Sequence, residues 1–166
     1  LGPDEGYDQS VMEGVSAALD QTIRHWKLWT RTLYVPLDWQ EAVIRAAITL
    51  KLSVFEDTGA IVAAMTTSIP EAPGSQRNWD YRYCWLRDAF FVVRALNSLS
   101  EVGTLEDYLR WLGNVVVEAD GGHIQPLFGI GLERDLPESM QEHLGGYRGM
   151  GPVRVGNQAQ EHFQHD

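Results

Sequence analysis

The residues best suited to chemistry lie in the segment 77–88, RNWDYRYCWLRD, which holds four aromatic rings and five charged side chains in twelve residues. The aromatic residues recur with period two: Trp79, Tyr81, Tyr83 and Trp85. On an extended chain this spacing sends all four rings to one face and the intervening residues to the other. Arg87 and Asp88 follow at the point where the pattern changes to that of a helix.

Flat aromatic faces beside a guanidinium and a carboxylate are suited to holding a sugar. The rings cover the C–H faces of a pyranose, and the charged groups hydrogen-bond its hydroxyls, each such bond contributing about 1.5–3 kcal/mol. A buried aromatic core, with Arg87 and Asp88 as an ion pair and a helix cap, explains the same spacing. The spacing alone leaves both interpretations open.

Two helices are predicted ahead of this segment. The first covers residues 11–30, and its apolar residues recur at steps of three or four along one face: Val15, Leu19, Ile23 and Trp26. The second begins after Asp38, which is expected to cap it with Glu41 three residues on. Residues 43–55 of this helix are apolar on most of its circumference, so burial on most sides is expected.

The remaining chain alternates between extended and helical patterns. Residues 58–69 are expected to form a strand-like excursion, and residues 88–99 a second interior helix. Residues 104–118 carry one apolar stripe, which predicts a surface helix: Leu105, Tyr108, Leu109, Leu112, Val115 and Val116. Glycine and proline dominate residues 121–156, which predicts a long loop, and residues 153–164 are expected to start a further helix.

Four stretches of the chain resemble glycoside hydrolase family 15, the glucoamylase, glucodextranase and bacterial trehalase group. They occur in the family's order and approximate spacing: DWQEAVIRAAITLK, TGAIVAAMTTSIPEAPG, NWDYRYCWLRDAFF and GYRGMGPVRVGN. The match covers roughly residues 20–166, and the run over residues 79–88 is long enough to be specific.

The resemblance implies a mainly α fold. Family members have a catalytic toroid of six helix pairs, and this chain supplies about the first third of it, as a partial (α/α)6 toroid with a short strand-like excursion. Residues 1–34 are expected to be a linker helix, and residues 35–166 the N-terminal portion of the catalytic domain. Because family members are much longer than 166 residues, we expect the chain to be a fragment. Its unpartnered apolar helix faces then favour self-association.

The resemblance also implies a function, that of an inverting glycoside hydrolase that releases glucose from α-linked glucosides, glucoamylase-like or trehalase-like. Inversion needs a general acid and a general base with carboxyl groups about 6.5–9.5 Å apart. The family's two glutamates for these roles lie downstream of the matched segments. We therefore nominate no catalytic residue and expect this chain alone to be inactive.

The resemblance implies a substrate-binding set in two parts. The first part lines the pocket for the terminal glucose: Tyr81, Trp85, Arg87 and Asp88. The second part matches a family segment near the binding cleft: Tyr147, Arg148, Arg154 and Asn157. For this second part, anchoring of the loop by arginine to backbone carbonyls is an equally good interpretation.

Two other functions stay open at this point. One is a noncatalytic carbohydrate-binding or scaffold domain that uses the same aromatic site. The other is a different helical-toroid glycosidase, such as one acting on β-linked glucans.

Charge and composition limit the kinds of partner that the chain is expected to bind. The net charge of −10 disfavours nucleic acid and anionic membranes, whereas a neutral α-glucoside or oligosaccharide is compatible with it. No apolar run reaches the length of a membrane span, and a cytoplasmic location is expected. A single cysteine, Cys84, excludes an internal disulfide and is expected to be an inert core thiol. The histidines, His123, His143, His162 and His165 among them, show no recognisable ligand spacing, so neither a metal nor a cofactor is expected.

Overall fold

The computed structural model describes residues 10–119, 122 and 124–161. The first nine residues of the expected linker, together with His123, His162 and His165, lie outside the described residues. As predicted, the described chain is mainly helical. Its helices are α1 (Val11–Thr32), α2 (Gln40–Leu52), α3 (Leu86–Ser98) and α4 (Gly103–Glu118).

The strands are short and form three antiparallel pairs. They are β1 (Val54–Phe55) with β2 (Ala60–Ile61), β3 (Cys84–Trp85) with β4 (Leu127–Phe128), and β5 (Ser139–Met140) with β6 (Arg154–Val155). Two short 3-10 turns, η2 (Tyr147–Gly149) and η3 (Gln158–Glu161), lie in the C-terminal part. The expected helix from residue 153 is wrong for the described residues, because β6 and η3 occupy its start.

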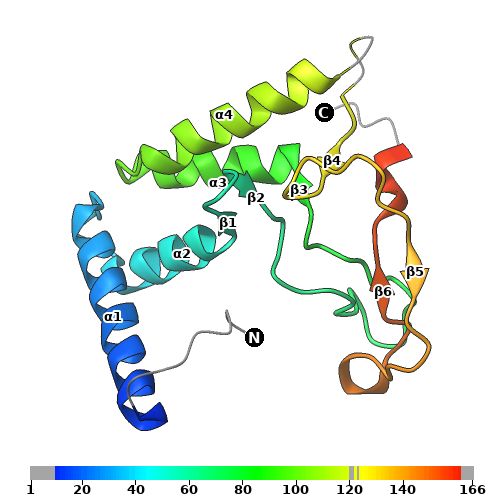
Figure 1. Ribbon diagram of the computed structural model, residues 1–166, viewed down its shortest axis with the longest axis horizontal. Helices are drawn as coiled ribbons and strands as arrows, with labels where there is room; N and C mark the ends of the chain where they lie inside the picture. Colours follow the sequence, from blue (N-terminus) through cyan, green and yellow to red (C-terminus); the bar gives the residue numbers. More distant parts are fainter. Residues whose placement is uncertain (1–9, 120–121, 123, 162–166) are drawn as a thin grey trace.

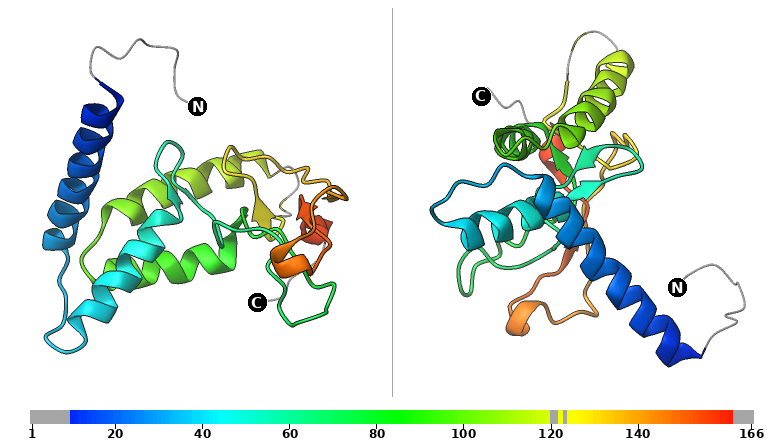
Figure 2. Two further views of the ribbon diagram at one scale, coloured as in Figure 1. Left: turned by 90° about the horizontal axis from the view of Figure 1, so that it is seen from below. Right: turned by 90° about the vertical axis from the view of Figure 1, so that its left-hand side faces the viewer.

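Each helix packs on the next one along the chain, as Figure 1 shows. α1 extends away from the rest of the molecule in both views of Figure 2. A capping box begins it, in which the Glu13 backbone N–H donates to Ser10 Oγ at 3.4 Å and the Ser10 N–H donates to the Glu13 carboxylate at 3.2 Å. The helix is confirmed, but none of its residues is buried, and three residues of its predicted apolar face are exposed: Val15, Leu19 and Ile23.

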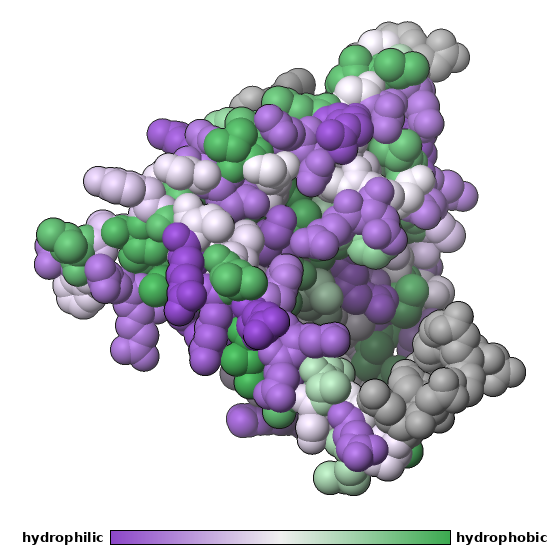
Figure 3. All heavy atoms as spheres, turned by 60° about the vertical axis from the view of Figure 1, so that its left-hand side comes forward, coloured by the Kyte–Doolittle hydropathy of each residue, from purple (hydrophilic) through white to green (hydrophobic). Residues whose placement is uncertain are grey.

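The two helices predicted to be interior are buried on one side only. α2 buries Ala47, and α3 buries Ala89, Val93 and Leu96. The rings of Phe90 and Phe91 are 54% and 59% exposed. The expectation of burial on most sides is therefore wrong for the described chain, because packing partners contact only one face of each helix. Figure 3 shows apolar groups exposed among polar ones on one side of the molecule.

The start of α2 also differs from the prediction. Its N-cap is Trp39, which has a left-handed backbone with φ of 63° and makes no side-chain cap hydrogen bond. Asp38 therefore does not cap this helix. The predicted boundary was one residue too early, because Asp38 is of a type that favours the N-cap position whereas Trp39 is not.

The main core lies between α3, α4 and the β3–β4 pair. Trp111 of α4 is 1% exposed, stacks on Tyr108 at 5.7 Å between ring centroids and meets Phe128 of β4 edge-on at 6.0 Å. The predicted one-sided helix is confirmed, but its buried stripe differs: Thr104, Tyr108, Trp111 and Val115 are buried. Two members of the predicted stripe, Leu109 and Val116, are more than half exposed.

This succession of packed helices is compatible with a partial helical toroid, and the toroid itself stays a prediction. The expected strand-like excursion over residues 58–69 is present in β2 and in a bridge between Thr67 and Asp80, but residues 58 and 59 lie in the turn that precedes β2. No described helix is both long enough and apolar enough to span a bilayer.

Replacing Trp111 by alanine should strongly destabilise the fold. The change removes a buried ring and leaves a cavity in the core, which costs about 3–5 kcal/mol. Chemical denaturation measures the loss. The matched control is Val117→Ala on the same helix, where the side chain is 85% exposed and the expected change is within about 0.5 kcal/mol. Equal stability of the two variants would contradict the assigned core.

Candidate functional site

The aromatic segment is extended, as its period-two pattern predicts. Four backbone hydrogen bonds tie it to residues 63–68: Ser68 N to Trp79 O, Ala64 N to Tyr81 O and Ala63 N to Tyr83 O, each 2.9 Å, and Tyr81 N to Thr66 O at 3.3 Å. β3 then pairs with β4, and α3 begins directly afterwards at Leu86. Arg87 and Asp88 therefore lie in the first turn of α3.

Three of the four rings line one cavity of about 760 Å³: those of Trp79, Tyr81 and Trp85. Tyr83 does not line it and instead interacts with the backbone of Gly156. The prediction of four rings on one face is wrong at this position, because the backbone bends at Tyr83 before β3 starts. The cavity thus has three aromatic walls from a single segment.

Charged groups complete the lining of this cavity. Arg77 Nε lies 2.6 Å from the Glu71 carboxylate, Arg87 Nε lies 3.6 Å from the Asp88 carboxylate, and Arg154 forms an ion pair with Glu138. The remaining lining residues are Ala63, Asn157, Gln158 and Ala159. Apolar ring faces and paired donors and acceptors therefore surround one space, which suits a hydroxylated ring.

The pair at the start of α3 is accessible from the cavity. The side chains of Arg87 and Asp88 are 45% and 44% exposed, so both have polar atoms open to a ligand. The Arg87 guanidinium also lies 5.7 Å from the centroid of the Trp85 ring, within cation–π range. Ring and ion pair thus form one continuous wall.

The opposite face of the segment anchors a distant part of the chain. Asn78 is fully buried, and its amide donates to Met150 O at 3.0 Å and to Pro152 O at 2.9 Å. Asp80 is 1% exposed, and its carboxylate accepts from the Gly156 N–H at 3.2 Å and from Arg82 Nε at 2.9 Å. These bonds fasten residues 150–157 against the aromatic segment. We call Asn78 and Asp80 the clamp.

Further hydrogen bonds fix the two residues of this distant part that line the cavity. The Asn157 amide donates to Asp80 O at 3.0 Å. The Arg154 N–H donates to Ser68 Oγ at 2.7 Å, and Thr67 Oγ1 donates to Arg154 O at 2.6 Å. The Arg154 guanidinium lies 5.3 Å from the centroid of the Trp79 ring and donates to Gln76 O at 3.4 Å. It therefore both lines the cavity and bonds a backbone carbonyl.

A glycine permits this close approach. Gly156 has φ of 90°, and a Cβ at this position would overlap the carbonyl group of Pro137. Residues 136–138 and residues 154–157 consequently lie in direct contact, which brings Glu138 to Arg154.

Two predicted site residues lie elsewhere. Tyr147 and Arg148 belong to η2 and do not line the cavity, and the Arg148 guanidinium lies 5.4 Å from the Tyr147 ring. Gly146 and Gly149, both with positive φ, turn the chain on either side of them. Their predicted sugar contacts stay a prediction, whereas the structure brings the other six predicted residues to one cavity: Tyr81, Trp85, Arg87, Asp88, Arg154 and Asn157.

Seven lining residues were not among the predicted site residues: Ala63, Glu71, Arg77, Trp79, Glu138, Gln158 and Ala159. For Trp79 a signal existed, because it shares its period-two face with Tyr81. No sequence pattern marked Glu71, although its partners Arg77 and Tyr81 lie nearby in the sequence. Glu138 had no local signal, because its partner Arg154 belongs to another segment, β6.

Tyr81 is a residue of the cavity wall whose pKa is shifted. Its hydroxyl donates to Glu71 Oε1 at 3.0 Å. Burial, followed by this hydrogen bond, raises the pKa of Tyr81 above its usual value. The tyrosine therefore keeps its proton at neutral pH and acts as a donor to Glu71.

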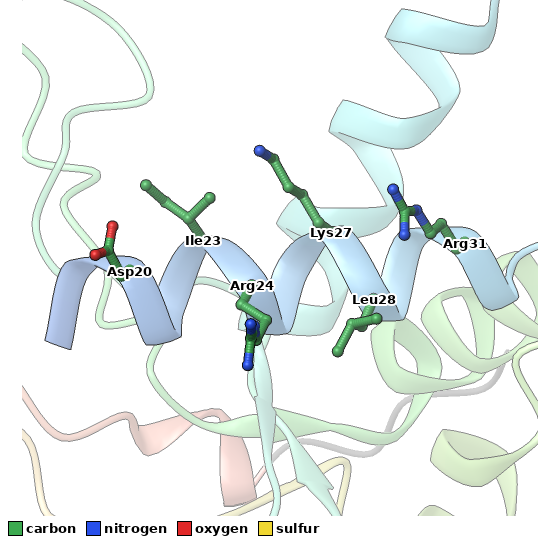
Figure 4. Close-up of a pocket in the computed structure, with 6 residues that line it drawn as sticks. All are labelled: Asp20, Ile23, Arg24, Lys27, Leu28 and Arg31. Atoms are coloured by element: carbon green, nitrogen blue, oxygen red, sulfur yellow. The ribbon is translucent and has the colours of Figure 1, made fainter. Parts of the chain in front are cut away.

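Other hollows in the described chain follow single helices. Figure 4 shows one of about 470 Å³ on α1, where Ile23, Lys27 and Arg31 point to one side and Arg24 and Leu28 to the other. Side chains that diverge from one helix do not converge on a ligand. The cavity beside the aromatic segment is therefore the better candidate site.

Comparison with known proteins decides the family. The sequence profile described as Glycosyl hydrolases family 15 matches residues 38–166. The chain belongs to this family. Family 15 membership agrees with the resemblance carried by the aromatic segment. The matched range includes every residue that lines the cavity.

Relatives of this family 15 chain include named trehalases. It is 36% identical to a trehalase of Mycobacterium tuberculosis over 99% of this chain and 24% of the relative. It is 38% identical to a trehalase of Mycolicibacterium smegmatis over 88% of this chain and 22% of the relative. A trehalase of Thermoplasma volcanium is 35% identical over 89% of this chain and 23% of the relative. The chain spans about a quarter of the length of these relatives. No solved structure matches it significantly.

Replacing Asn78 by alanine should loosen residues 150–157 of the family 15 chain. The change removes the donor to two carbonyls, leaving buried acceptors unpaired at about 1–3 kcal/mol. Hydrogen exchange at the amides of Arg154, Gly156 and Asn157 should accelerate by about tenfold or more. The exposed residue Gln76, replaced by alanine, is the control and should leave exchange unchanged. Unchanged exchange in Asn78→Ala would contradict the clamp.

The lone cysteine should be unreactive in the folded chain. Cys84 is fully buried, and burial raises the pKa of its thiol to about 12, so the reactive thiolate is nearly absent at pH 8. An aromatic disulfide reagent should therefore label the native protein at pH 8 far more slowly than the unfolded one. The control is the protein in denaturant, where the reagent should label one thiol per chain. Rapid native labelling would show that β3 opens readily.

Proposed function

We propose that this chain carries the sugar-binding part of a trehalase-like glycoside hydrolase that releases glucose from an α-linked glucoside with inversion. The observation that supports it most is the convergence of three aromatic rings with the Arg87–Asp88 pair around one cavity. Relatives named as trehalases make trehalose the first substrate to test, and other α-glucosides follow.

The rings and the pair have separate roles in this proposal. Tyr81 and Trp85 cover the apolar face of the terminal glucose, and Arg87 and Asp88 bind its hydroxyls as donor and acceptor. Arg154 and Asn157 form a second wall, held in place by the clamp, beside the next sugar unit. A site that binds hydroxyls with both donors and acceptors also binds analogues that lack those hydroxyls more weakly, because the hydrogen bonds to them are lost.

The proton-transfer groups belong, in this proposal, to the complete protein beyond this chain. The carboxylates of the cavity, those of Glu71, Asp88 and Glu138, are each engaged with an arginine. We therefore offer none of them as general acid or base, and we expect this chain alone to be inactive. The cytoplasmic location expected from the sequence also stays a prediction.

Replacing Arg87 or Asp88 by alanine in the complete protein should remove most activity on α-glucosides. Each charged hydrogen bond to a hydroxyl contributes about 1.5–3 kcal/mol, which corresponds to a fall in kcat/KM of roughly 10- to 100-fold. The control is Arg110→Ala on α4, whose side chain is 72% exposed and pairs with Asp107. Melting temperatures of all three variants should match the wild type.

Near-normal turnover in both pocket variants would remove the role assigned to Arg87 and Asp88. Product analysis by NMR tests the mechanism as well, because inversion at an α-linkage releases β-glucose first. Saturable binding of glucosides by the complete protein without any turnover would instead favour the noncatalytic carbohydrate-binding function.

A further inference from the structure

We propose that Glu71 and Glu138 are specificity-determining residues, which neutralise Arg77 and Arg154 so that the cavity accepts neutral sugars and discriminates against phosphorylated ones. The inference rests on the proposed sugar-binding function and deepens it. Its basis is the charge balance of the cavity rather than the aromatic walls.

The charges that line the cavity cancel within the described part of the chain. Three guanidiniums and three carboxylates line it, and each guanidinium has a carboxylate within ion-pair distance. The chain as a whole carries a net charge of −10. The lining of the cavity is therefore neutral although the chain is acidic, because each arginine that lines the cavity has a carboxylate partner there.

An arginine without its carboxylate would attract phosphate. The guanidinium fork matches phosphate oxygens in a bidentate arrangement, and arginine is common wherever phosphate is recognised. Glu71 occupies this position at Arg77 and also accepts from Tyr81, while Glu138 occupies it at Arg154. A phosphate that approached either arginine would meet the neighbouring carboxylate, and like charges repel.

The two ion pairs differ in exposure, which predicts that they differ in how strongly they disfavour phosphate. The Arg77 and Glu71 side chains are 69% and 35% exposed, whereas those of Arg154 and Glu138 are 13% and 15% exposed. Solvent and salt screen the first pair more strongly. Glu138 should therefore contribute more to discrimination than Glu71.

Neutral hydroxyls still have partners at these pairs. A carboxylate has about four lone-pair positions and a guanidinium has five N–H donors, so one ion pair leaves further acceptors and donors available. Side by side, they fit two adjacent hydroxyls of a sugar, one donating and one accepting.

The test uses Glu71→Gln and Glu138→Gln in the complete protein. Glutamine keeps the shape of the side chain and removes one negative charge. Dissociation constants for glucose and for glucose 6-phosphate are measured by calorimetric titration at low salt. The ratio of the dissociation constant for glucose to that for glucose 6-phosphate should rise about fivefold in the first variant and about twentyfold in the second. The gain should shrink at high salt.

Matched controls separate local charge from net charge. Two double variants restore the charge balance of the cavity and should lose the tighter relative binding of glucose 6-phosphate. They are Glu71→Gln with Arg77→Gln, and Glu138→Gln with Arg154→Gln. Glu106→Gln, on the exposed face of α4, changes the net charge equally and should change neither constant.

An unchanged ratio of the two constants in both single variants would overturn the inference, as would wild-type protein that binds glucose 6-phosphate as tightly as glucose. Hydrolysis of α-glucosides by the wild type, measured separately, reports on the proposed function. Intact hydrolysis with an unchanged ratio therefore overturns the charge argument alone.

Discussion

The site depends on how one buried carboxylate obtains its hydrogen bonds. Asp80 is almost fully buried, and a buried charge is costly unless its oxygens are paired. Arg82, two residues along the same segment, supplies part of the pairing, but the Gly156 backbone supplies the rest from 76 residues away. Stabilising Asp80 therefore requires residues 150–157 to be in place, and the same placement brings Arg154 and Asn157 to the cavity.

The core of the molecule reaches the site through β3. Phe128 of β4 packs against Trp111, and it is the register partner of Cys84. The next pair in that register joins Leu127 to Trp85, the last aromatic wall of the cavity. The first turn of α3 follows directly, with Arg87 and Asp88. Packing between α4 and β4 thus sets the position of one ring and of the ion pair beside it.

Local patterns in the sequence predicted the helices and most of the aromatic wall, because helix and strand periodicities depend on nearby residues alone. Burial of α2 and α3 was overestimated, since it depends on which neighbours are present rather than on the apolar pattern. The bend at Tyr83 broke the alternation at one position. Glu138 had no local signal, because its ion pair with Arg154 forms only after β5 and β6 pair. Glu71 pairs with Arg77 within one loop, and no sequence pattern marked that pair.

Gly156 joins two loops without a side chain between them. A methyl group there would press on Pro137 and push the two backbones apart, and one of those backbones carries Glu138 while the other carries Arg154. The same displacement would pull the Gly156 N–H away from Asp80. A single added carbon would thus disturb an ion pair that lines the cavity and remove a donor from a buried carboxylate at the same time.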